Sequence, residues 1–385
     1  MSVASFFSSL PARPFGYKDG RGRTGMVPTT DIGRRMVKPP VLACRPIESN
    51  TYHGSVTSVF LTKSSRSPSP SLSPTPTALD DEIVLDLKPF LIIYKSGRIE
   101  RFLGTTVIPA CPEVATKDVV IDPATGVSVR LYLPNVVDLP SKKLPVLVYF
   151  HGGGFVIENT GSPNYHNYLT LLAAKAGVLI VSINYRLAPE YPLPASYDDC
   201  MAGFNWVVSH SAGPALEPWL AQHGDFSQIL LSGDSAGGNV THYVAMRADA
   251  GVIEGVAIVH PYFLGSEPVG NEINDPANIE FHDKLWRLAA PDTEGLDDPL
   301  INPVAPGAPS LAGLKCKRAV VFVAGNDFLV ERGRMYYEAL VKSGWRGEAE
   351  LVQHEGVGHV FHLSDYSGDI SVAMMTKLIA FLKGE

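Results

Sequence analysis

The chain has 385 residues, of which 45% are hydrophobic and 18% are charged, so it can bury a sizeable core as one large domain or two average ones. Residues 1–78 carry ten basic and three acidic side chains, a net charge of +7, whereas residues 79–385 carry 22 and 36, a net charge of −14. A body this acidic is a poor candidate for binding nucleic acid, because phosphate contacts need a basic face. No uninterrupted apolar run approaches the length of about 18 residues that a membrane-spanning helix needs.

Residues 1–77 are predicted to be a disordered plastid transit peptide that is cleaved from the mature protein. Residues 1–78 contain 21 Ser or Thr, and the segment ends in a run rich in Ser and Pro. This basic, hydroxyl-rich and acid-poor composition is typical of organelle import, whereas a secretory signal needs a continuous apolar region. A disordered cytosolic tail of the same composition is the alternative. We expect cleavage near Thr77 or Ala78 and a mature protein, residues 78–385, in the plastid.

From residue 79 onward, short β-rich runs alternate with helical segments. Residues 119–121 and 127–133 predict a β-hairpin. The strands expected next cover 144–150, 178–183, 228–232, 254–259, 319–324 and 349–353, and the helices between and after them cover 164–176, 196–209, 235–249, 330–343 and 369–382. This alternation predicts an α/β fold with a mostly parallel central sheet, helices on both faces and antiparallel strands at one edge. Residues 79–116 and 263–312, the latter with a helix over 276–288, are expected to form lid segments.

A G-x-S-x-G motif, Gly233–Gly237, lies between the apolar run that ends the third parallel strand and a segment compatible with a helix. In that context the motif forms a sharp turn that exposes the serine hydroxyl at the sheet edge. An ordinary turn rich in Gly and Ser is the alternative. We expect Ser235 to be a catalytic nucleophile.

A serine hydroxyl becomes a good nucleophile when a base takes its proton and a third group orients the base. In a sheet of this type the acid and the histidine follow the serine along the chain, on loops after later strands. Asp327 follows the strand 319–324, and His359 follows the strand 349–353. These positions predict a catalytic triad of Ser235, Asp327 and His359, whereas the alternatives are a helix N-cap for Asp327 and a core histidine for His359.

A second glycine motif, His151–Gly154, follows the strand 144–150. Consecutive glycines allow backbone N–H groups to point at a tetrahedral oxyanion, together with the N–H of the residue after the nucleophile. The predicted donors are Gly153, Gly154 and Ala236, and Gly152 is expected to be needed for the turn. A merely flexible glycine loop is the alternative.

Three polar residues close to these motifs are expected to have structural roles. Asp234 should fix the elbow by hydrogen bonding, Asn239 should support the helix after Ser235, and His362 should pack away from the apex of its loop.

No metal site and no cofactor are predicted. His354 and Glu355 begin a pattern similar to the zinc motif H-E-x-x-H, but the second histidine comes one residue too late, and two glycines interrupt any helix there. The chain also lacks a phosphate-binding loop. The three cysteines of the expected mature part, Cys111, Cys200 and Cys316, are odd in number and widely spaced, which favours free thiols.

Four stretches together resemble the plant carboxylesterases of the hormone-sensitive-lipase group: 151–154, 184–190 (N-Y-R-L-A-P-E), 233–239 and 358–361. The resemblance covers essentially all of residues 79–385 and implies an α/β-hydrolase fold; relatives also suggest a homodimer. One departure is Glu331, where many relatives have a second Asp. The same fold supplies gibberellin receptors, which resemble esterases that have lost the catalytic histidine, and His359 argues against that non-catalytic alternative.

Within this group, the chain and its leader are similar to plastid enzymes that act on a glucose ester of 4-hydroxy-2-methylenebutanoate. The resemblance implies an acyl-enzyme on Ser235, from which the acyl group's own hydroxyl closes a lactone and leaves glucose as the other product. A general plastid carboxylesterase that passes the acyl group to water is the alternative.

Overall fold

The computed structural model describes residues 82–110, 115–134, 143–211, 217–272 and 275–385. The predicted transit peptide, its cleavage site and Cys111 lie outside these ranges. Among the residues that are described, no helix has both the length and the apolar character that a membrane span needs.

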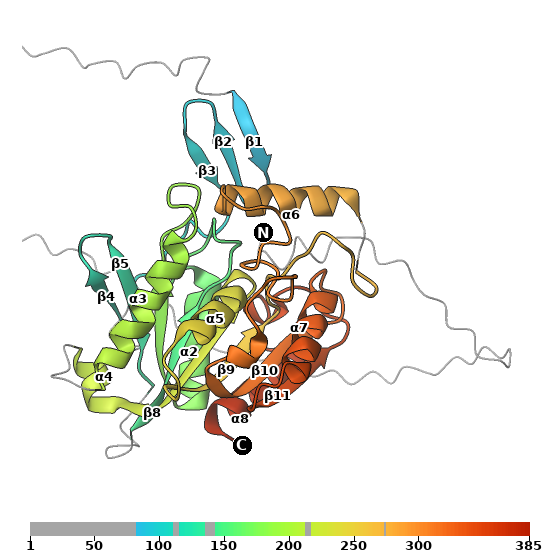
Figure 1. Cartoon of the computed structure of the whole chain (residues 1–385). Coiled ribbons are helices and arrows are strands. Elements are labelled where there is room, and N and C mark those ends of the chain that lie inside the picture. The colour runs from blue at the N-terminus through green and yellow to red at the C-terminus, as the bar shows by residue number, and fades with distance from the viewer. Residues whose placement is uncertain (1–81, 111–114, 135–142, 212–216, 273–274) are drawn as a thin grey trace, which may run out of the picture. The chain divides into compact units, whose positions relative to one another are not determined.

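An eight-stranded sheet forms the centre of the fold (Figure 1). Its strands are β4 (Thr116–Asp122), β5 (Val127–Tyr132), β6 (Leu144–Phe150), β7 (Leu179–Asn184), β8 (Gly224–Asp234), β9 (Ile253–Val259), β10 (Cys316–Ala324) and β11 (Glu348–His354). The spatial order is β11-β10-β9-β8-β6-β7-β5-β4. Neighbours from β11 to β7 are parallel, and β5 and β4 continue the sheet in antiparallel pairing. The predicted α/β architecture with an antiparallel edge is therefore confirmed.

Both faces of the sheet are buried, because successive strand residues point to opposite sides. In β6, Val146 and Val148 belong to one core cluster, whereas Leu147 and Tyr149 belong to the other. The first cluster includes helices α3 (Ala195–Ser209), α5 (Ala236–Arg247) and α7 (Val330–Lys342), and the second includes α2 (Pro163–Ala176) and α8 (Asp369–Lys383). This two-sided cover explains why inner parallel strands such as β6 and β7 are nearly continuous apolar runs.

The predicted helix and strand positions agree closely with the structure, apart from differences at the ends of some elements. Strands β4 and β10 each begin three residues before the expected start. Strand β8 begins at Gly224, four residues before the expected start, and α5 begins at Ala236 because Ser235 has a positive φ that does not continue a helix. The short helix α4 (Pro218–His223) was not expected.

The expected lid segment 79–116 contains secondary structure that the sequence analysis did not assign. Strands β1 (Ile83–Leu87), β2 (Leu91–Tyr94) and β3 (Ile99–Arg101) form a separate antiparallel sheet. Figure 1 shows this sheet beside α6 (Pro276–Ala289), the helix expected in the second lid segment. Phe90, in the turn between β1 and β2, packs on Phe281 of α6 with ring centroids 5.7 Å apart. The two lid segments thus contact each other.

Candidate active site

Ser235 occupies a strained turn between the end of β8 and the start of α5. Its φ of 53° and ψ of −120° are unusual for a residue with a side chain. The flanking glycines are required by close backbone contacts: a Cβ on Gly237 would lie 1.9 Å from the carbonyl oxygen of Phe150, and one on Gly233 would lie 2.3 Å from the carbonyl oxygen of Gly237. The turn therefore has the geometry that the motif predicted.

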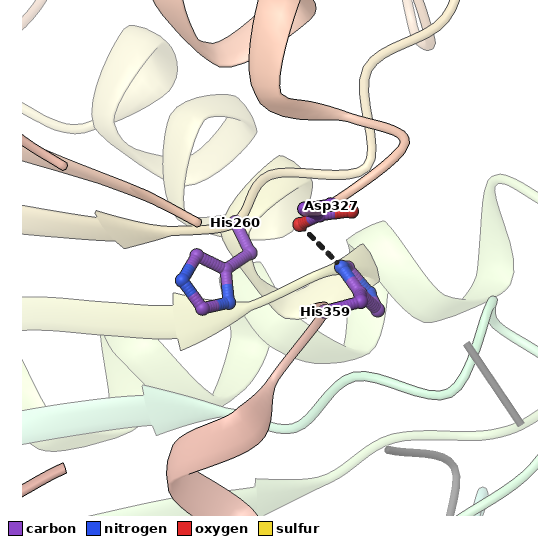
Figure 2. Close-up of side chains that lie close together, drawn as sticks. All are labelled: His260, Asp327 and His359. Carbon is purple, nitrogen blue, oxygen red and sulfur yellow. Dashed lines mark hydrogen bonds and ion pairs between the residues drawn. The ribbon is translucent and has the colours of Figure 1, made fainter. Parts of the chain in front are cut away.

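The three residues predicted as a triad lie in one hydrogen-bonded chain. Ser235 Oγ is 2.9 Å from His359 Nε2, and His359 Nδ1 is 2.8 Å from Asp327 Oδ2; Figure 2 shows the second contact. Since an ionised carboxylate only accepts hydrogen bonds, Asp327 fixes the proton of His359 on Nδ1 and leaves Nε2 to accept the serine O–H. Asp327, His359 and Ser235 are all buried.

Asp327 is held in its charged form by its neighbours. Burial alone would raise the pKa of the carboxyl, but His359 beside it and the N–H groups that bond to it keep the pKa below its ordinary value. One of these is the N–H of Leu329, which donates to Asp327 Oδ1 over 3.0 Å. This bond closes a turn just before α7, but Asp327 is not the helix N-cap considered as its alternative, because Leu329 occupies that position.

His260 is a further residue of the site that the sequence analysis missed. It follows β9 directly, and its Nδ1 accepts a hydrogen bond from the N–H of Val360 over 3.0 Å. Burial lowers the pKa of His260 to about 3, so the ring is neutral at ordinary pH. Its contact supports the backbone next to His359, where Val360 has a φ of 46°. The place of His260 at the carboxyl end of a parallel strand is the sequence signal that could have identified it.

His260, Asp327 and His359 are close enough to hold a metal ion (Figure 2). However, Asp327 and His359 bond directly to each other, and His260 Nδ1 already accepts a backbone N–H. A cation would have to replace these contacts, so the arrangement fits a hydrogen-bonded group better than a metal centre.

The second glycine motif lies beside the nucleophile. Within the described parts of the chain, the N–H groups of Gly153, Gly154 and Ala236 have no hydrogen-bond acceptor. Gly153 and Gly154 have φ values of 102° and 60°, which a glycine adopts without strain. Free N–H groups next to a nucleophile are the feature that an oxyanion hole requires. Their assignment as its donors remains a prediction.

Asp234 and Gly152 connect the two motifs. The hydroxyls of Tyr149 and Tyr165 donate to Asp234 over 2.7 and 2.8 Å, and the N–H of Gly152 donates to the Tyr165 hydroxyl over 2.7 Å. A Cβ on Gly152 would lie 2.7 Å from Asp234 Oδ2. Asp234 thus fixes the elbow, as expected, and Gly152 is needed for this close approach.

The nucleophile and the glycine loop lie in the wall of a cavity. Ser235, His359, Gly153 and Gly154 line it, and the lid supplies Phe90 from the β1–β2 turn and His282 and Leu285 from α6. Residues of both expected lid segments therefore line the cavity at Ser235.

The remaining residues considered in the sequence make structural contacts. Asn239 accepts from the Tyr197 hydroxyl over 2.7 Å and donates to the carbonyl of Leu300 over 2.7 Å, so it ties α5 to its neighbours. His362 is buried and packs edge-on against Tyr168. His354 ends a strand and not a zinc helix. Cys200 and Cys316 are free thiols.

Comparison with known proteins agrees with this geometry. A family described by its alpha/beta hydrolase fold matches residues 147–363. The chain is 98% identical to tuliposide A-converting enzyme 2, chloroplastic, and 77% identical to tuliposide A-converting enzyme b1, amyloplastic, both from Tulipa gesneriana; each alignment covers all of both chains. These names confirm the expected plastid localisation.

Among solved structures, the hyperthermophilic esterase from Pyrobaculum calidifontis is similar to this chain, with a TM-score of 0.58 and 25% identity. The match covers 70% of this chain and 83% of the esterase. The resemblance to esterases inferred from the motifs is therefore confirmed in sequence and in fold. The chain belongs to the α/β-hydrolase fold family.

Proposed function

We propose that this protein is a plastid serine-triad enzyme that converts a 4-hydroxy-2-methylenebutanoyl glucose ester, tuliposide A, to a lactone and glucose. The observation that carries the proposal is the chain of hydrogen bonds from Ser235 through His359 to Asp327 in the wall of a cavity. The names of the tulip relatives support the choice of substrate.

In the first half of the reaction, Ser235 attacks the ester carbonyl while His359 takes its proton. The N–H groups of Gly153, Gly154 and Ala236 stabilise the oxyanion, and loss of one such donor typically raises a barrier by about 2.7–4 kcal/mol. His359 then protonates the departing glucose oxygen, which leaves an acyl group on Ser235.

In the second half, the acyl group's own 4-hydroxyl attacks the acyl carbonyl and closes a five-membered ring. His359 takes the proton of that hydroxyl and returns it to Ser235 as the lactone leaves. A well-oriented intramolecular nucleophile has an effective concentration of about 10⁵–10⁸ M, far above that of liquid water, so ring closure outruns hydrolysis. The net reaction is an intramolecular transesterification that needs no cofactor.

Product analysis tests this proposal. The wild-type protein should release lactone and glucose in equal amounts, and Ser235→Ala should release neither while remaining folded. Free hydroxy acid as the sole product would instead assign a hydrolytic carboxylesterase, and an absence of turnover of any ester by the wild type would favour a binding protein. The homodimer stays a prediction from the resemblance.

A further inference from the structure

Glu158 is an unusual residue in the wall of the cavity that contains Ser235. Its side chain is buried, with 8% of the residue exposed. Its φ of 76° lies in the left-handed region, which a residue with a side chain rarely adopts. The backbone around Gly104 packs closely on it, since a Cβ on Gly104 would lie 2.2 Å from the Glu158 nitrogen. The fold therefore holds this side chain in a defined place at an energetic cost.

The carboxyl of Glu158 forms no ion pair within the part of the chain that the structure describes. It contacts the Ser162 hydroxyl, and the negative charge of Asp234 repels it. Burial raises its pKa above the ordinary value. Burying a carboxylate without a cation destabilises a protein, so the position of Glu158 makes more sense if a ligand completes its hydrogen bonds.

Other polar side chains line the same cavity as Glu158. Asn164, at the start of α2, and Ser364, after the short helix η3 (Phe361–Leu363), also line the cavity. Their two segments are tied together, because the Tyr366 hydroxyl donates to the Asn164 carbonyl over 3.2 Å. A carboxylate, an amide and a hydroxyl therefore belong to adjoining segments.

Several apolar side chains of the same cavity come from the expected lid segments and from the loop that carries Asp327. Leu285 lies on α6, Phe90 packs on α6 through Phe281, and Phe328 stacks on His282 of α6 with ring centroids 4.4 Å apart. Apolar residues also lie beside the polar ones, since Val360 and Leu363 come from the same segment as Ser364, and Ser235 lines the cavity that all of them share.

We propose that Glu158 is a specificity-determining residue that binds the sugar of the ester. Its carboxylate accepts hydrogen bonds from hydroxyl groups of the glucosyl leaving group, while the acyl group contacts Leu285, Phe90 and Phe328. Sugar hydroxyls suit this site because a carboxylate only accepts hydrogen bonds and bonds most strongly when it is charged. An aryl ester without hydroxyl groups cannot form these bonds. This inference rests on the glucose ester proposed above as substrate.

The test compares two esters on the full chain and on three variants. Glu158→Leu removes the carboxylate, Glu158→Gln removes the charge at nearly constant shape, and Glu217→Gln is a control for loss of a buried carboxylate outside the cavity. The substrates are the 4-hydroxy-2-methylenebutanoyl glucose ester, followed by glucose release, and p-nitrophenyl acetate, which has no sugar.

For Glu158→Leu, kcat/KM for the glucose ester should fall at least about 30-fold, in the range for a lost hydrogen bond to a charged group. The value for p-nitrophenyl acetate should stay within about threefold, Glu158→Gln should be intermediate, and the control should match the wild type. An equal fall for both esters, or no fall for the glucose ester, would overturn the assignment.

Different results would contradict the lactone reaction and the sugar contact of Glu158. Glucose release counts ester cleavage whether the acyl group leaves as lactone or as acid, so free acid as the product would reject the lactone reaction but not the sugar contact. If the wild type did not cleave the glucose ester at all, both proposals would be wrong.

Discussion

Asp234, next to the nucleophile, has a buried carboxyl group whose contribution to the free energy of unfolding depends on pH. Burial raises its pKa to about 6, although two tyrosine hydroxyls that donate to it act in the opposite direction. A pKa above that of the unfolded chain means that the folded protein binds more protons in this range. The contribution of Asp234 to the free energy of unfolding is therefore complete below about pH 4 and is lost as the pH rises through about 6.

Asp234→Asn should remove this contribution. Between pH 4 and pH 7 the stability difference between the wild type and the variant should change by up to about 3 kcal/mol, the equivalent of a pKa shift of roughly two units. The difference should favour the wild type more at the lower pH. Urea unfolding of both proteins across this range measures it, and parallel stability curves would contradict the raised pKa.

Strand β3 is joined by one side chain to the loop that carries Gly153 and Gly154. Arg101 donates to the carbonyls of Val156 and Ala188 over 2.6 and 3.0 Å and forms a two-point contact with Glu190. A lysine keeps the charge but cannot reach all these acceptors at once. Arg101→Lys should therefore lower the free energy of unfolding by about 1–3 kcal/mol and kcat/KM several-fold, because the loop of Gly153 and Gly154 loses support.

Glu190→Gln is the matched control for this contact. The Glu190 side chain is 43% exposed, and an exposed ion pair contributes about 1 kcal/mol or less. Its loss should change urea unfolding and ester turnover less than Arg101→Lys does. Equal effects of the two variants would show that the ion pair, and not the bonds to the loop carbonyls, holds β3 in place.

Several of the elements that the sequence predicted well are buried on both faces. Strand β6 and residues 319–324 of β10 are apolar runs between turn residues, and such runs indicate a strand wherever the sheet is covered twice. The strands β1–β3 were missed because they are short and partly exposed, as Ile83 and Val84 show with exposures of 48% and 57%. In such strands hydrophobicity carries little signal.

The same contrast holds for the site. Ser235, Asp327 and His359 could be predicted because a glycine motif fixes the first, and strand ends in a set order locate the other two. Glu158 and His260 are single polar residues without a motif, and their roles depend on a cavity wall and on one backbone N–H. Contacts of that kind arise from the packing of distant segments, which a sequence pattern does not specify.

At the scale of the whole molecule, the chain divides by charge into a basic leader and an acidic body. Within the ranges that the structure describes, the residues that line the cavity of Ser235, from Phe90 onward, belong to the acidic body. The composition of the leader, rich in Ser and Pro and poor in acids, favours recognition by an import system over packing into a core. We therefore expect residues 1–77 to contribute nothing to catalysis.

Removal of residues 1–77 tests this division. The shortened protein should keep kcat/KM for its ester within about twofold, and its free energy of unfolding should stay within about 0.5 kcal/mol, the range of changes that touch no buried contact. Steady-state kinetics and urea unfolding of the full and shortened chains measure both quantities. A loss of activity beyond about fivefold would mean that the leader supports the lid or the site, and that the mature enzyme begins before residue 78.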